Sequence, residues 1–144
     1  MPETMEHLQL VKYIIAHIHH KYNYLPGLTL LIDTPSAEAK DKPPRIARFS
    51  PDVYAIDVPV TTTIIGEAKT AYDLTTVHSR EQISAFIEHL HYSPCGILVL
   101  AVPWQFVACA KIVVESAKRS LSVDPGNVEV TVLDGTEVRG RSDS

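Results

Sequence analysis

The sequence predicts an α/β domain in which helices flank a central mixed β-sheet, with elements in the order αβββαβαβ. Three segments carry apolar residues at helical spacing, and short apolar or alternating runs of strand length lie between them. The run over residues 96–102 is apolar throughout, which is typical of a strand covered on both faces. A chain of 144 residues, of which 45% are hydrophobic, can build one such core. We therefore expect a single domain over residues 1–135 and a polar tail over residues 136–144.

The first half of the chain predicts one helix followed by three strands. The helix carries an apolar stripe at spacings of three and four residues, and Thr4 or Glu3 could cap its first turn. A Pro-Gly turn ends the helix, and a polar loop over residues 33–44 separates the first two strands. A turn that contains Pro59 joins the second strand to the third. In chain order, the predicted elements cover residues 3–22, 28–32, 45–56 and 61–70.

The second half of the chain alternates helices with strands. Ser79 has the character of a helix N-cap, and Gln82, three residues later, would complete a capping box. Ser93 and Pro94 end this helix, and a turn at residues 124–127 precedes a last strand whose apolar residues alternate. In chain order, the predicted elements cover residues 79–91, 96–102, 105–121 and 128–133.

Charge and composition narrow the classes of function. A net charge of −4 argues against tight, non-specific DNA binding by a monomer, and it leaves room for a partner protein that supplies target recognition. The apolar runs are too short to cross a bilayer, and the first residues do not resemble a secretory signal. Cys95 and Cys109 lack metal-ligand spacing, and their apolar neighbours predict buried thiols in a reducing compartment. We therefore expect a cytoplasmic protein without a membrane segment. One basic cluster lies just upstream of Asp52, where a nucleic-acid backbone could pass: Lys40, Lys42, Arg45 and Arg48.

The predicted hairpin brings two acids and a lysine together. Asp52 precedes one apolar run, and Glu67 and Lys69 end the next. In a hairpin centred between Pro59 and Val60, Asp52 falls opposite Glu67, where facing Cβ atoms lie about 4.5–5.5 Å apart. Glu67 and Lys69 leave the same face because side chains alternate along a strand. The pattern therefore predicts two carboxylates and one amine around a common point.

Each of these residues also has an ordinary structural interpretation. Asp52 could cap a turn, and Glu67 and Lys69 could form an ion pair on a solvated strand face. However, the residues around Glu67 are apolar, which indicates a central strand, and a buried carboxylate is costly unless a cation pairs with it. The sequence therefore favours a site for a divalent metal ion. It contains no glycine-rich phosphate loop, dinucleotide fingerprint, nucleophile elbow or zinc-protease motif, which argues against those common sites.

The pattern Pro51-Asp52 followed by Glu67-Ala68-Lys69 resembles the PD-(D/E)XK, or restriction-endonuclease-like, nuclease superfamily. The motif covers five residues, and the order of the elements extends the resemblance over most of the chain. The resemblance implies that Asp52 and Glu67 bind Mg²⁺, for which Mn²⁺ can substitute, and that the backbone carbonyl of Ala68 is a further ligand. It also implies that Lys69 positions the attacking water or stabilises the charge that develops on the phosphate.

Two further positions follow from the same resemblance. Many members carry an acid in the first helix that completes the metal shell; Glu6 is the best-placed candidate, ahead of Glu3. Glu6 could equally complement the dipole of that helix. Many members also carry a glutamine in the helix after the lysine, and Gln82 matches it, with the capping box as the other interpretation.

The resemblance thus implies Mg²⁺-dependent hydrolysis of DNA phosphodiester bonds. The preference for DNA over RNA follows from the family and not from particular residues of this chain. A homodimer would supply the two sites that are needed to cut both strands of a duplex. Two alternatives stay open: a catalytically silent binding module with the same fold, and a subunit of a larger DNA-processing or defence assembly.

Overall fold

A computed structural model describes residues 4–135 of the chain. Five strands form one mixed sheet in the order β1-β2-β3-β4-β5. The first three strands form an antiparallel meander, and the last two continue the sheet in parallel. The prediction of an α/β fold with a mixed sheet flanked by helices is confirmed at this level. The strands are β1 (Thr29–Ile32), β2 (Val53–Ile56), β3 (Thr62–Ala68), β4 (Cys95–Val102) and β5 (Val128–Asp134).

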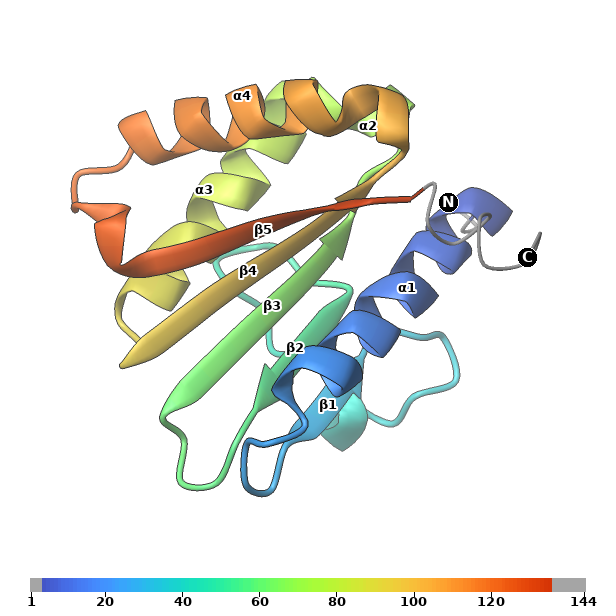
Figure 1. Cartoon of the computed structure of the whole chain (residues 1–144), viewed down its shortest axis with the longest axis vertical. Coiled ribbons are helices and arrows are strands. Elements are labelled where there is room, and N and C mark those ends of the chain that lie inside the picture. Colours follow the sequence, from blue (N-terminus) through green and yellow to red (C-terminus); the bar gives the residue numbers. More distant parts are fainter. Residues whose placement is uncertain (1–3, 136–144) are drawn as a thin grey trace.

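Helices cover both faces of the sheet (Figure 1). Helix α1 (Met5–Tyr22) lies on one face, and α3 (Val77–His91) and α4 (Val107–Arg119) lie on the other. A short helix, α2 (Ala71–Leu74), precedes α3 and adds one element to the predicted order. Three 3₁₀ turns complete the described structure: Ala39–Asp41, Trp104–Phe106 and Pro125–Asn127.

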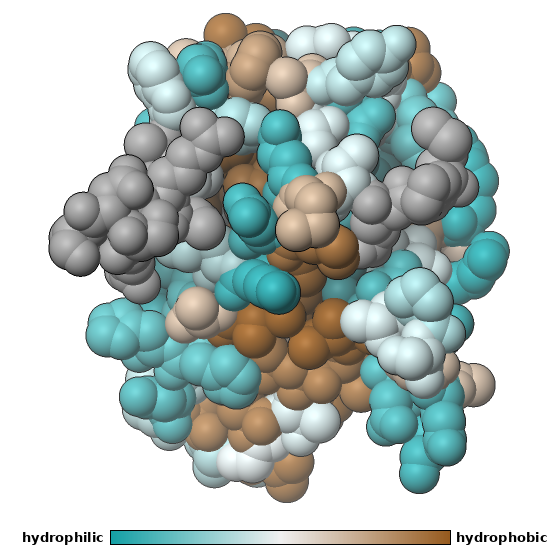
Figure 2. Space-filling model, turned by 90° about the vertical axis from the view of Figure 1, so that its right-hand side faces the viewer, coloured by the Kyte–Doolittle hydropathy of each residue, from teal (hydrophilic) through white to brown (hydrophobic). Residues whose placement is uncertain are grey.

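A hydrophobic core lies on each face of the sheet. Ile14 of α1 packs with the face that includes Ile64, and Phe86 of α3 packs with the face that includes Ile65. Neighbouring residues of β3 thus serve opposite cores, as strand alternation requires. Figure 2 looks onto the side that carries α1 and shows hydrophobic atoms gathered near the middle of this view. Partly buried hydrophobic residues pack against the core on the α1 face: Tyr13, Ile15, Leu25, Leu28 and Leu30.

The register of the central hairpin agrees with the predicted one. Val53 pairs with Gly66, and Ile56 pairs with Thr63, so the hairpin is centred between Pro59 and Val60. This register decides which residues face each other at the open end of the hairpin, where β2 begins and β3 ends.

The predicted second strand, over residues 45–56, was too long. Only Val53–Ile56 is a strand, and the preceding residues form a tight turn in which Ile46 and Phe49 exchange backbone hydrogen bonds. Ala47 in this turn has a φ of 55°, which no regular strand contains. Pro51 has no N–H to donate to a neighbouring strand, so it favours a late start for β2.

Three smaller expectations also need comment. The last helix begins at Val107, after the 3₁₀ turn, and not at residue 105. Both cysteines are free thiols, but Cys95 is exposed at the first position of β4 and Cys109 is half-buried, so the prediction of two buried thiols was wrong. The predicted polar tail and Glu3 lie outside the described residues. No helix within residues 4–135 combines the length and the apolar character that crossing a membrane requires.

Gly66 allows α1 to approach β3 closely. A Cβ atom at this position would lie 2.5 Å from Ile14 Cγ2 and 3.2 Å from Val53 Cβ. Because Ile14 is β-branched and fully buried, it has little freedom to move away.

We expect Gly66→Ala to lower the free energy of unfolding by about 1–3 kcal/mol. Urea denaturation measures this loss. Gly126→Ala is the control variant, because its new Cβ would meet nothing closer than 3.3 Å. Equal losses in the two variants would contradict it.

Candidate active site

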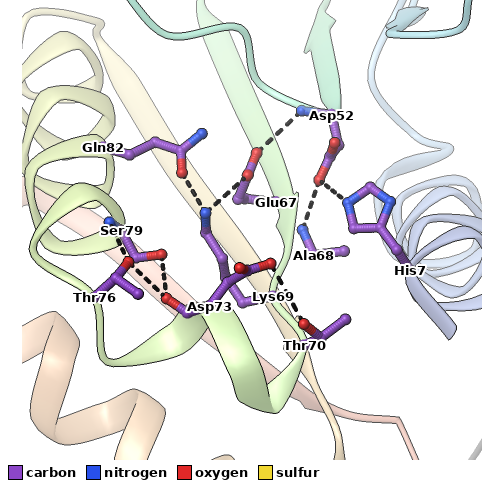
Figure 3. A network of polar contacts seen from close by, with 10 residues as sticks. All are labelled: His7, Asp52, Glu67, Ala68, Lys69, Thr70, Asp73, Thr76, Ser79 and Gln82. Carbon is purple, nitrogen blue, oxygen red and sulfur yellow. Dashed lines mark hydrogen bonds and ion pairs between the residues drawn. The ribbon is translucent and has the colours of Figure 1, made fainter. Parts of the chain in front are cut away.

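Four of the predicted residues converge at the carboxyl end of β3 (Figure 3). Asp52 immediately precedes β2, and Glu67 and Lys69 lie at and just beyond the end of β3. Gln82 comes from α3, which packs on the same side. All four side chains are polar, yet none of these residues is more than 8% exposed. Burial on this scale requires that each polar group has a partner.

The two carboxylates are anchored by the hairpin backbone. The backbone N–H of Asp52 donates to Glu67 Oε1 at 3.1 Å, and the N–H of Ala68 donates to Asp52 Oδ2 at 2.9 Å. Asp52 and Glu67 therefore meet across the hairpin, as the register predicts. Each carboxylate thus accepts from a backbone N–H that belongs to the other acid or to its neighbour in sequence.

Lys69 links the carboxylates to α3. Its Nζ lies 3.5 Å from Glu67 Oε2 and donates to Gln82 Oε1. Within residues 4–135, Lys69 is the one lysine or arginine in contact with either carboxylate. The buried cluster thus contains two acids and one lysine.

The position of Gln82 depends on how α3 begins. The N-cap of α3 is Thr76, whose Oγ1 accepts from the N–H of Ser79 at 3.1 Å. The Ser79 hydroxyl donates to the carbonyl of Asp73 at 2.6 Å. The predicted Ser79–Gln82 capping box was therefore wrong, because the helix begins three residues earlier than Ser79 would require. Gln82 is left free to reach Lys69.

Burial and charge together raise the pKa of Glu67 well above that of an ordinary glutamate. The largest cause is the loss of solvent around the charged form, and the nearby Asp52 carboxylate adds to it. Lys69 and the hydrogen bond from the Asp52 N–H act in the opposite direction but do not cancel the rise. In the absence of a further cation, the pair carries more negative charge than its surroundings stabilise.

His7 is a member of the site that the sequence did not indicate. Its Nε2 lies 3.2 Å from Asp52 Oδ2, and the residue is partly buried. The position follows from the start of α1, where the Thr4 hydroxyl accepts from the His7 N–H at 3.1 Å. The sequence argument considered only carboxylates in this turn. The signal that could have found His7 is its place one residue after Glu6, on a turn expected to face the hairpin.

Glu6 and Ala68 take different positions relative to the cluster. Glu6 is exposed in the first turn of α1 and makes none of the contacts within residues 4–135 that hold the cluster together. Its role as a metal ligand therefore stays a prediction. Ala68 is buried between Glu67 and Lys69, and its N–H contacts Asp52; the role of its carbonyl as a ligand also stays a prediction.

The donor set fits a hard divalent cation such as Mg²⁺. Mg²⁺ is commonly held by one or two carboxylates while it keeps several waters, so Asp52 and Glu67 could hold it without a complete protein cage. Among residues 4–135 there is no group of three or more histidine, cysteine, aspartate or glutamate residues arranged to hold a metal ion. The fit therefore depends on the carboxylate pair and its excess negative charge.

Comparisons with known proteins add no further constraint. No protein-family model, curated protein or solved structure matches the chain. What the site can do must be inferred from the arrangement of its own residues.

The raised pKa of Glu67 predicts how stability changes with pH when no divalent metal is present. The folded state holds the Glu67 proton more tightly than the unfolded state, in which a glutamate pKa is about 4.3. The stability linked to this proton is complete below the unfolded pKa and is lost as the pH rises through the raised pKa of the folded state. Relative to Glu67→Gln, we expect the wild-type free energy of unfolding to fall by up to about 1.4 kcal/mol per pH unit in this window.

Urea denaturation in EDTA between about pH 4 and pH 8 measures this difference. Glu67→Gln is a matched variant because glutamine keeps an oxygen that can accept from the Asp52 N–H. Parallel pH profiles for the two proteins would contradict the electrostatic interpretation.

Proposed function

We propose that the protein is a Mg²⁺-dependent nuclease that hydrolyses DNA phosphodiester bonds, with a fold and site of the PD-(D/E)XK type. The observation that carries this proposal is the buried pair of carboxylates, Asp52 and Glu67, which Lys69 only partly neutralises. Structural networks usually balance such charges, because uncompensated buried charge is destabilising. At a site that binds a divalent cation, the ion itself supplies the missing positive charge.

The order and pairing of the elements support the proposal. The resemblance implies a helix, a three-stranded meander, a helix and a further strand; the chain has α1, an antiparallel meander of β1–β3, α3 and a parallel β4. The acidic pair lies where the meander ends, and Lys69 follows two residues after Glu67, as the motif requires.

The chemistry expected of the site divides among its residues. A Mg²⁺ ion bound there would polarise a phosphate oxygen and lower the pKa of a coordinated water. Asp52 and Glu67 would hold the ion. Lys69, on the same strand face as Glu67, would orient the attacking water or stabilise the negative charge that develops on the phosphate. The leaving group would be the sugar 3′-oxygen, so the product would carry a 5′-phosphate.

Gln82 and His7 would act as positioning residues. The Gln82 amide oxygen accepts from Lys69 and holds the ammonium group at the end of β3. His7 contacts the same oxygen of Asp52 that accepts from the Ala68 N–H, so it limits the rotation of that carboxylate. Neither residue needs to contact the substrate in order to affect the rate.

Metal binding predicts a gain in stability. We expect Mg²⁺ or Mn²⁺ at about 100 times its dissociation constant to raise the free energy of unfolding of the wild-type protein by about 2.7 kcal/mol. Asp52→Asn and Glu67→Gln should each remove this gain. Glu115→Gln, on an exposed part of α4, should retain it. Calorimetric titration measures metal binding, and thermal denaturation measures the gain in stability. An equal gain in all four proteins would exclude this metal site.

Cleavage should depend on Lys69 separately from metal binding. We expect Lys69→Ala to lower the cleavage rate by about 10²–10³-fold while metal-induced stabilisation persists. A panel of linear, circular, branched and single-stranded DNA, with RNA, in Mg²⁺ and in Mn²⁺, tests activity and substrate choice. Asp52→Ala should be inactive, and Lys111→Ala, at an exposed site on α4, should cleave as the wild type does. Undiminished cleavage by Lys69→Ala would contradict the assigned role.

A non-catalytic binding module is the second candidate. It is favoured by the net charge of −4 and by the fact that the side chains of Asp52, Glu67, Lys69 and Gln82 all contact one another or the nearby backbone. This candidate predicts neither metal binding nor cleavage. If the protein is instead a subunit of a larger assembly, we expect it to bind metal but to cleave DNA weakly until the partner protein is added.

A further inference from the structure

Residues 42–50, which we call the basic segment, present positive charge on a fixed support. Every third residue is buried: Pro43, Ile46 and Phe49. The residues just before each of them are exposed, and all three are basic: Lys42, Arg45 and Arg48. Ile46 and Phe49 belong to the core on the α3 face of the sheet. The segment is therefore anchored by apolar contacts while its cations face solvent.

A tight turn positions Arg48 within this segment. The N–H of Ile46 donates to the carbonyl of Phe49 at 2.8 Å, and the reverse hydrogen bond measures 3.0 Å. Ala47, between them, adopts the left-handed conformation with a φ of 55°. Two backbone hydrogen bonds and two buried side chains thus hold the arginine at the tip of the turn.

Arg48 lies against α3, next to the candidate active site. Its guanidinium carbon is 4.8 Å from the centre of the Phe49 ring, and that ring packs against His78 of α3 at 5.2 Å between centroids. The guanidinium forms an ion pair with Glu81, whose neighbour in sequence is Gln82, the partner of Lys69.

The chain also limits the distance between Arg48 and the acidic pair. Asp52 follows Arg48 by four positions, so their Cα atoms cannot lie more than about 14 Å apart. Successive phosphates of one DNA strand advance about 3.4 Å along the helix axis. A backbone cleaved at Asp52 and Glu67 could therefore reach Arg48 within a few nucleotides of the cleaved bond.

We propose that Arg48 binds a phosphate of the DNA backbone close to the cleaved bond, and that Glu81 holds the arginine in place until this phosphate replaces it. The inference rests on the proposed function, because the candidate active site defines where the backbone passes. The Arg48 and Glu81 side chains are 66% and 49% exposed, and an exposed ion pair contributes only about 0–1 kcal/mol. A phosphate can therefore displace Glu81 at little cost, and its oxygens match the planar guanidinium as well as a carboxylate does.

The proposal also accounts for how a chain of net charge −4 could hold DNA. A local basic surface, and not the overall charge, decides where a polyanion binds. Glu81 neutralises one of the three cations of this surface when no DNA is bound, which reduces non-specific association. Once the arginine has changed partner, the freed Glu81 carboxylate turns to solvent.

The test compares DNA binding by variants that change charge without changing side-chain size greatly. All are made in the Lys69→Ala background, in which we expect cleavage to be about 10²–10³-fold slower than in the wild type. A fluorescein-labelled DNA duplex of about 20 base pairs is titrated in Mg²⁺ from about 50 to 200 mM NaCl. Arg48→Gln and Glu81→Gln are the test variants. Arg119→Gln and Glu115→Gln are matched controls with the same changes of charge, at exposed positions toward the far end of α4.

We expect Arg48→Gln to weaken binding about three- to tenfold relative to Arg119→Gln. It should also reduce the slope of log K against log salt by about 0.9, the value for one phosphate contact on duplex DNA. Glu81→Gln should strengthen binding about two- to fivefold relative to Glu115→Gln, because Arg48 then has no competing carboxylate.

The sign of the Glu81→Gln effect separates this proposal from a structural role of the ion pair. If Glu81 only supports the basic segment, its loss would weaken binding as the loss of Arg48 does, and the proposal would be overturned. Equal binding by Arg48→Gln and Arg119→Gln would also overturn it. The proposed nuclease function fails on different results, namely no metal binding and no cleavage by the wild-type protein.

Discussion

The pairing of Asp52 with Glu67 is the interaction on which the site depends. Like charges in a buried position repel, and each carboxylate is kept there by an N–H from the opposite strand of the hairpin. The hairpin register is therefore also a constraint on the chemistry. A shift of one residue would turn Glu67 to the other face of the sheet and separate the pair.

Two helices supply the rest of the site because the sheet carries helices on both faces. Helix α3 contributes Gln82 from one side, and α1 contributes His7 at the edge where Asp52 begins the meander. The absence of a side chain at Gly66 allows α1 to lie close to β3 where Ile14 packs. Core packing and the candidate chemistry thus share the same short stretch of β3, where every residue from Thr62 to Ala68 is buried.

Charge is distributed unevenly in a way that is consistent with a polyanionic substrate. The acidic pair is buried and only partly neutralised, whereas the nearby cations of residues 42–50 are exposed on a firmly anchored turn. Buried charge has strong local effects, and exposed charge is screened and easily exchanged between partners. The candidate metal site and the surface that would bind the DNA backbone therefore differ in burial as their roles require.

Much of this arrangement could be predicted from the sequence, because strand alternation and turn position are local properties. The hairpin register, the common face of Glu67 and Lys69, and the element order all followed from spacing. The helix start at Thr76 did not, because it depends on competition between two nearby capping residues. The contact of His7 with Asp52 and the ion pair of Arg48 with Glu81 did not either, because they join residues 45 and 33 positions apart in the chain. Only tertiary packing decides which of several chemically suitable side chains reaches a site, and that is why the contact of His7 with Asp52 emerged only from the structure, while the role of Glu6 as a metal ligand stays a prediction.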